Sequence, residues 1–256
     1  MRIIINADDF GASTEINLAI AEAFSRGWIT NTTIMANMPG FDHAVELSKQ
    51  QAFFDKVGIH LNFFEGIPLT AKIKDETLFC SNGEMTSFHL FHETPPYKRF
   101  LLPKHTRRAL YEEAVAQFEN YTRAGFTEFH LDSHGHSHTI PSVFLSIKKA
   151  IRAYGFKTIR RNLNLFVHKS WSIRAYKALC GRLLTSAFKS TDYFTSAKEF
   201  IEAINAGIVK GEVTCEIMVH PIFEEGKLKN AGSVDFEELF SFMQNKELIS
   251  YVNYGD

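Results

Sequence analysis

The chain has 256 residues, of which 45% are hydrophobic and 22% charged, as is ordinary for a globular protein. Its formal net charge of −1 gives no general attraction to nucleic acid or anionic membranes, so neither is expected as a partner. The three cysteines form no zinc pattern or disulfide framework, which favours a reducing compartment. The N-terminus is too poor in apolar residues for a signal peptide, and no stretch is long enough to cross a bilayer. We therefore expect a cytoplasmic protein.

Short apolar runs alternate with amphipathic segments along most of the chain. This alternation predicts an α/β fold with a mostly parallel sheet. With no internal repeat or flexible linker in view, we expect one domain that spans residues 1–256. Strands are predicted at residues 2–6, 29–37, 57–63, 129–133, 157–161, 192–195, 213–219 and 248–252; helices are predicted from residue 13 or 14 to Gly27, and at 41–51, 106–124, 142–154, 170–188, 197–206 and 235–244.

The alternation stops between residues 66 and 105. Prolines and an Asn82-Gly83 pair punctuate this segment, which has little hydrophobic period. A long irregular segment in a compact protein is usually a functional lid or an ordered insertion. We therefore treat residues 66–105 as an inserted segment near the substrate cleft.

Four of the eleven histidines and an aspartate lie between residues 128 and 138. In a strand over residues 129–133, His130, Asp132 and His134 share one face. The strand should end near residue 134, and α/β folds place ligands and catalytic groups at this end of a strand. A metal or catalytic site is favoured over a solvated loop. For His136 and His138, a place near the substrate and a place in a solvated turn both stay open.

Reactive groups follow four of the predicted strands. Asp8 and Asp9 follow the first, His60 lies in the third, and His220 follows the strand at residues 213–219. Because the carboxyl ends of parallel strands lie on one side of a sheet, these groups can meet. One carboxylate with two imidazoles is a common ligand set for a catalytic divalent metal. The alternative for the two aspartates is a turn in which Asp9 caps the next helix.

The same segments resemble the motifs of the YdjC family of carbohydrate deacetylases, which includes the chitooligosaccharide deacetylases. The resemblance implies a distorted (β/α) barrel related to polysaccharide deacetylases. It also implies an enzyme that removes N-acetyl groups from amino sugars with one divalent metal ion, Mg or Zn. The motifs are NADDFG at residues 6–11, GIHLN at 58–62 followed by EG at 65–66, HLDSHGHSH at 130–138 and MVHP at 218–221.

Carried over by position, the resemblance implies that Asp9, His60 and His134 are the metal ligands. It implies Asp8 as the catalytic base and His220 as the catalytic acid. The proposed chemistry is hydrolysis of the amide by a metal-activated water.

Two further residues receive predicted roles at the substrate side of the site. Arg160 holds Asp8 ionised and oriented, or contacts the substrate, or is a surface residue on a short strand. Asn62 is assigned to the substrate-binding side as well, and it could equally orient the ligands. A small N-acetylated sugar is the expected partner, and a homodimer is kept as an open alternative. The rival functions are a two-metal phosphoesterase and a non-catalytic sugar-binding protein on the same scaffold.

Overall fold

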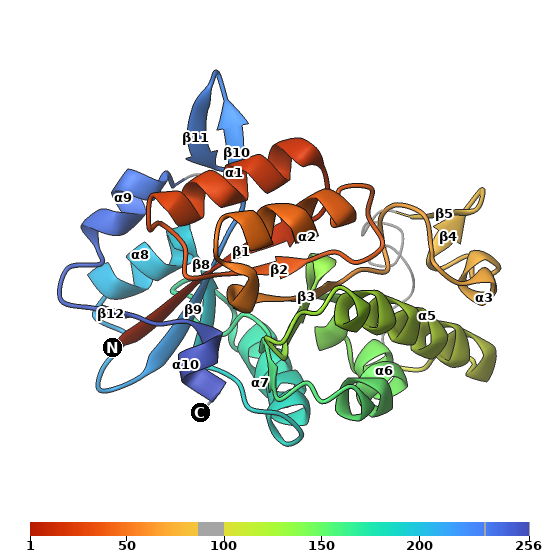
Figure 1. Cartoon of the computed structure of the whole chain (residues 1–256). Coiled ribbons are helices and arrows are strands. Elements are labelled where there is room, and N and C mark those ends of the chain that lie inside the picture. Colours follow the sequence, from red (N-terminus) through yellow and green to blue (C-terminus); the bar gives the residue numbers. More distant parts are fainter. Residues whose placement is uncertain (87–99, 233, 256) are drawn as a thin grey trace.

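The computed structural model describes residues 1–86, 100–232 and 234–255. A curled parallel sheet forms its centre (Figure 1). Within the described residues this sheet has eight strands, in the order β7-β6-β3-β2-β1-β9-β8, with β12 paired to the start of β1. They are β1 (Arg2–Phe10), β2 (Asn31–Ile34), β3 (Val57–Leu61), β6 (His130–Ser133), β7 (Thr158–Ile159), β8 (Tyr193–Ser196), β9 (Thr214–Val219) and β12 (Glu247–Leu248).

The two edges of the curled sheet meet through Lys189. Thr158 of β7 forms a parallel bridge with Lys189, whose carbonyl accepts a hydrogen bond of 2.9 Å from the amide of Ile159. Lys189 lies a few residues before β8, which pairs with β9. The sheet is therefore a distorted barrel, and the predicted fold class is confirmed.

Helices surround the barrel, with α1 and α2 on one side and α5 and α6 on the other (Figure 1). Within the described residues, every helix is too short or too polar to span a lipid bilayer. The α-helices around the barrel are α1 (Thr14–Ser25), α2 (Phe41–Gln50), α5 (Lys104–Arg123), α6 (Pro141–Ala153), α7 (Trp171–Thr185), α8 (Ala197–Asn205) and α9 (Phe236–Ser241), and the 3₁₀ helices are η1 (Phe54–Lys56) and η3 (His134–Thr139).

The hydrophobic core follows from the sequence of β1. Ile3, Ile4 and Ile5 are all fully buried, because both faces of a parallel strand are covered in this architecture. The first helix begins as predicted, since the hydroxyl of Ser13 accepts a hydrogen bond from the amide of Ile16. It ends at Gly27, whose positive φ of 69° suits glycine.

The described part of the inserted segment forms small elements against α5. These are α3 (Ala71–Lys74), β4 (Cys80–Ser81) and β5 (Glu84–Met85). Buried Glu113 of α5 accepts hydrogen bonds from the amides of Leu69 and Thr70, which ties the start of the segment to the helix. The described part of the segment is thus an ordered insertion, and residues 87–99 lie outside the described residues.

The prediction of a strand at residues 248–252 is wrong. Only Glu247 and Leu248 pair with β1, and the short helix α10 (Tyr251–Gly255) follows. The amide of Tyr251 donates a 3.0 Å hydrogen bond to the side-chain oxygen of buried Asn31, which turns the chain under the barrel. After β9, the hairpin of β10 (Pro221–Glu224) and β11 (Lys227–Asn230) projects beside α1 (Figure 1).

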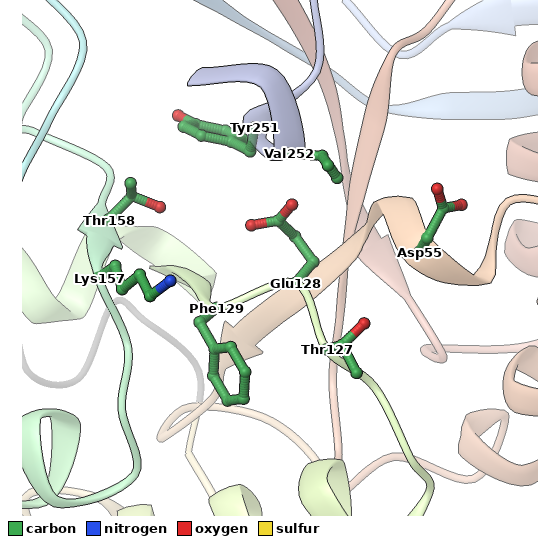
Figure 2. Close-up of a pocket in the computed structure, with 8 residues that line it drawn as sticks. All are labelled: Asp55, Thr127, Glu128, Phe129, Lys157, Thr158, Tyr251 and Val252. Atoms are coloured by element: carbon green, nitrogen blue, oxygen red, sulfur yellow. The ribbon is translucent and has the colours of Figure 1, made fainter. Parts of the chain in front are cut away.

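A pocket of about 170 Å³ lies next to α10. Figure 2 shows the residues that line it, which come from the starts of β6 and β7, from η1 and from α10. It therefore lies at the amino ends of the strands, on the opposite side of the sheet from the strand ends that carry Asp9, His60 and His134. The lining residues are Asp55, Thr127, Glu128, Phe129, Lys157, Thr158, Tyr251 and Val252.

Candidate metal centre

A bulge at the end of β1 directs two adjacent aspartates toward different partners. The pairing of β1 with β2 shifts register between Ala7 and Phe10, and Asp9 has a positive φ of 67°. Such a left-handed conformation is uncommon outside glycine and often marks a functional site. Asp8 points into the buried interior, whereas Asp9 faces the histidines at the strand ends.

The carboxylate of Asp9 lies between two imidazoles from neighbouring strands. Its Oδ1 is 3.2 Å from Nε2 of His60 in β3 and 2.9 Å from Nδ1 of His134 after β6. One donor atom from each of the three residues lies within 4.8 Å of the other two. The structure thus brings together the three residues that were predicted as metal ligands.

Each histidine also contacts a second carboxylate. His60 Nδ1 is 2.7 Å from Oδ1 of Asp132, which is fully buried. His134 Nε2 is 3.3 Å from Oε1 of Glu65, at the turn after β3. Ring nitrogens that bind metal in proteins usually have such a partner on the other side of the ring.

Burial and the neighbouring carboxylates set the protonation of this cluster. Burial lowers the pKa of His60, but the charge of Asp132 and hydrogen bonds to it and to Asp9 raise the pKa to about 10. For His134, burial is again outweighed, here by Asp9 and Glu65, and the pKa rises to about 9. Burial raises the pKa of Asp9, yet both histidines hold that pKa well below its usual range.

These residues fit a divalent cation. Without metal, two protonated imidazoles supply the positive charge that balances the carboxylates. A divalent ion would supply the same charge and replace both protons. One carboxylate and two imidazoles, with the outer nitrogens held by Asp132 and Glu65, match the donor set of catalytic Zn²⁺, and Mg²⁺ also binds carboxylates.

Below this cluster, the guanidinium of Arg160 pairs with three buried carboxylates. Its Nη1 and Nη2 each donate a 2.7 Å hydrogen bond to an oxygen of Asp8, and Nη2 lies 2.8 Å from Asp132. Nε donates a 2.6 Å hydrogen bond to Glu216 in β9, whose other oxygen accepts 2.5 Å from the hydroxyl of Tyr251. We call these five residues the Arg160 network.

The Arg160 network controls the charge of Asp8. Burial raises the pKa of Asp8, but the charge and hydrogen bonds of Arg160 outweigh it and hold the pKa well below its usual range. Arg160 is 0% exposed, so its side chain has no surface for a sugar to contact. Of the two predicted roles for Arg160, the geometry therefore favours holding Asp8 over contact with substrate.

Asn62 is also buried and shapes the turn after β3. Its side-chain oxygen accepts hydrogen bonds from the amides of Phe64 and Glu65, at 3.0 and 3.1 Å, and its amide group donates to the carbonyl of Glu65. Its hydrogen bonds within the described residues are to other protein groups, and it has no exposed surface. The geometry favours a role in orienting the turn over contact with substrate.

His220 stands at the open side of the cluster. Its Nε2 lies 4.0 Å from Oδ2 of Asp9, and its side chain is 35% exposed. The side-chain oxygen of Asn230, at the end of β11, accepts a 2.8 Å hydrogen bond from the backbone amide of His220. The hairpin that follows β9 therefore helps to hold this histidine beside Asp9.

Two other histidines of the motif, His138 and His136, differ in their contacts. Nδ1 of buried His138 accepts from the hydroxyl of Ser133 at 2.5 Å, while its Nε2 lies 2.8 Å from the carbonyl of Arg160 and donates to it. His138 therefore braces the loop. His136 is half-buried with a left-handed φ of 56°, stacks edge-on against Phe194, and within the described residues its buried Nδ1 has no hydrogen-bond partner.

Three residues of the site were not expected from the sequence: Glu216, Tyr251 and Glu65. A signal for Glu216 did exist, since it is the one charged residue in the apolar run at residues 213–219. Glu65 belongs to the EG pair of the family motif, which marks its position, but no role was assigned to it there. Nothing in the local pattern distinguishes Tyr251.

Known proteins are similar to this chain in sequence and in fold. The family model for YdjC-like proteins matches residues 2–251. A carbohydrate deacetylase of Clostridium beijerinckii is 31% identical over 99% of this chain and 95% of its own length. A carbohydrate deacetylase of Vibrio cholerae is 30% identical over 91% of this chain and 82% of its own length.

A solved structure has the same fold. It is that of a putative cellobiose-phosphate cleavage protein from Enterococcus faecalis, with a TM-score of 0.72 and 20% identity. The similarity covers 99% of this chain and 98% of that one, which confirms the fold over its whole length. With the family match over residues 2–251, the resemblance predicted from the four motifs is confirmed: the chain belongs to the YdjC family.

Proposed function

We propose that this protein is a metal-dependent hydrolase that removes N-acetyl groups from an amino sugar or a short, chitooligosaccharide-like oligosaccharide. The observation that carries the proposal is the convergence of Asp9, His60 and His134 within 4.8 Å, with His220 beside them. The family, and relatives named carbohydrate deacetylases, support the enzyme class and the carbohydrate substrate.

Asp9, His60 and His134 would hold one divalent ion, Mg or Zn. When bound, such an ion polarises a carbonyl group and lowers the pKa of a water molecule. Asp132 and Glu65 would keep the two rings oriented toward it from the outer side. The side chains of His134 and His220 are partly exposed, and the substrate would approach the cluster from this side.

Asp8 and His220 are the proposed base and acid. The two hydrogen bonds from Arg160 keep Asp8 ionised and in one orientation, and the same bonds make it a weak proton acceptor. His220, partly exposed beside Asp9, would donate a proton to the departing amine. Asp8→Asn removes the proton acceptor and His220→Ala the donor, so the two roles can be tested separately.

The arrangement disfavours a two-metal phosphoesterase. Within the described residues, two further groups of three ligand-type side chains occur, Asp8–His60–Asp132 and His130–Asp132–Glu216. In each, two carboxylates are already paired with Arg160. The guanidinium charge therefore occupies the place of a second cation.

The experiment measures acetate release from diacetylchitobiose and a panel of N-acetylated sugars by metal-depleted protein, with and without added Zn²⁺ or Mg²⁺. The His134→Ala variant should lose the metal-dependent release. Exposed His168→Ala is the matched control and should keep it. Absence of acetate from every sugar, with metal bound, would overturn the proposal.

A further inference from the structure

Each of the two histidines of the candidate metal centre lies between Asp9 and a second carboxylate. In each ring, one nitrogen faces Oδ1 of Asp9, at 3.2 Å for His60 and 2.9 Å for His134. The other nitrogen faces a second carboxylate, Asp132 at 2.7 Å or Glu65 at 3.3 Å. Asp132 and Glu65 thus occupy equivalent positions relative to the candidate metal site.

The two outer carboxylates differ in their surroundings. Asp132 is fully buried and also pairs with Arg160, so it belongs to the core of the barrel. The side chain of Glu65 is 48% exposed and lies at the rim. A mobile rim side chain would be a poor guide for an imidazole, because freezing it costs conformational entropy.

The backbone of Glu65, however, is held on both sides. Its amide donates to the side-chain oxygen of Asn62 at 3.1 Å. Its carbonyl accepts hydrogen bonds from the side-chain amides of Asn62 at 2.8 Å and Asn37 at 3.2 Å. The side chains of Asn62 and Asn37 also bond to each other. The Cα atom of Glu65 is therefore held in place, and only the side chain beyond it can move.

Helix α5 secures this turn in its place. The side chain of buried Gln117 accepts a 2.9 Å hydrogen bond from the amide of Asn62 and donates one of 2.6 Å to its carbonyl. Asn62 is thereby fixed at the end of β3, two residues after His60. A continuous set of hydrogen bonds runs from α5 through the turn to Glu65, and from Glu65 to His134.

We propose that Glu65 is the positioning residue of His134: its carboxylate accepts a hydrogen bond from Nε2–H and so presents Nδ1 to the divalent ion. This inference rests on the proposed function, since it assumes that Asp9, His60 and His134 hold that ion. It gives the buried Asn62–Gln117 pair a purpose, which is to support a rim carboxylate. His134 is then oriented from the turn that opens the inserted segment, whereas His60 is oriented from the core.

The test is calorimetric titration of Zn²⁺ into metal-depleted full-length protein. We expect Glu65→Ala to weaken Zn²⁺ binding about 10–100-fold, the usual effect of losing an outer partner of a histidine ligand. Glu65→Gln retains an acceptor oxygen and should lose less. Glu84→Ala, at another exposed glutamate, is the matched control and should bind as the wild type does. Circular dichroism of the metal-free variants checks that each one is folded.

Binding by Glu65→Ala within twofold of the wild type would overturn the positioning role. A loss as large as that of His134→Ala would also overturn it, because Glu65 would then be a ligand itself. Wild-type protein that binds no Zn²⁺ overturns this inference and the metal dependence together. Wild-type protein that binds Zn²⁺ yet releases no acetate overturns the proposed activity alone, and the Glu65 comparison can still be made.

Discussion

Arg160 and Asp8 are 152 positions apart in the chain, yet Nη1 and Nη2 of Arg160 each donate a 2.7 Å hydrogen bond to one oxygen of Asp8. The pair is buried and lies directly under the candidate metal centre. Glu216 and Asp132 bring two more carboxyl groups to the same guanidinium. The orientation of Asp8 and the stability of the barrel therefore depend on one cation.

Replacement of Arg160 by methionine should strongly destabilise the protein. It leaves three buried carboxylates without their cation, and breaking a buried ion pair on one side costs about 3–5 kcal/mol. Urea unfolding measures the loss in free energy. Arg107→Met, at an exposed position, is the control and should change the free energy by less than about 0.5 kcal/mol. Equal unfolding midpoints for the two variants would contradict the central role of Arg160.

Loss of the Tyr251 hydroxyl should destabilise the protein from a site far from the substrate. Tyr251→Phe removes the 2.5 Å donor to Glu216 and leaves one oxygen of a buried carboxylate without it. We expect a cost of about 1–3 kcal/mol. Thermal unfolding would show a Tm lowered by roughly 2–4 °C for each kcal/mol. Tyr193→Phe, outside the Arg160 network, serves as the control. An equal Tm for both variants would contradict a stabilising role of the Tyr251 hydroxyl.

The stability of the protein should fall in mild acid, partly through His138. Burial lowers the pKa of His138 to about 4, and its usual value is about 6.5. The unfolded state binds a proton on this imidazole more readily than the folded state does. The stability that neutral, buried His138 contributes is therefore fully present above pH 6.5. This stability, about 3 kcal/mol, is lost as the pH falls from 6.5 through 4.

Chemical unfolding at several pH values between 7.5 and 4 tests this dependence on His138. His138→Gln can still donate to the carbonyl of Arg160 but cannot be protonated, so its stability should fall less steeply with pH. The exposed His168→Ala variant should keep the steep wild-type dependence. A wild-type slope in His138→Gln would assign the acid sensitivity to other groups.

A bound metal ion should raise the free energy of unfolding, and a tighter-binding ion should raise it more. A ligand that binds only the folded state adds about 2.7 kcal/mol at a free concentration 100 times its Kd. We therefore expect Zn²⁺ or Mg²⁺ to raise the Tm of the wild type and a chelator to reverse this. His134→Ala should show no such rise. A metal-dependent shift that persists in His134→Ala would place the ion elsewhere.

The architecture and the meeting of the site residues could be predicted because both follow from local pattern. Alternating strands and helices imply a parallel sheet, and parallel strands bring their carboxyl ends to one side. Asp9, His60 and His134 each lie at such an end, so their approach needed no knowledge of the loops. The family motifs then gave them roles, which stay predictions until the variants are measured.

The helix at the end of the chain and the burial of the polar site residues depend on contacts between distant parts of the chain. Tyr251 lies in a short apolar run whose pattern does not distinguish a strand from a helix, and its bonds to Asn31 and Glu216 decide the outcome. The burial of Arg160 and Asn62 is likewise set by partners elsewhere, which is why the sequence left contact with substrate open for both. Sequence shows that a residue is polar, but it does not show which carboxylate it will reach.

Because the Arg160 network draws on residues 8, 132, 160, 216 and 251, it is assembled late in translation. A ribosome releases the barrel strands in order, and domains begin to fold during synthesis. Until residue 251 leaves the exit tunnel, Glu216 lacks its tyrosine. A nascent chain without Tyr251 should therefore lack the part of the folding stability that this hydroxyl contributes through Glu216.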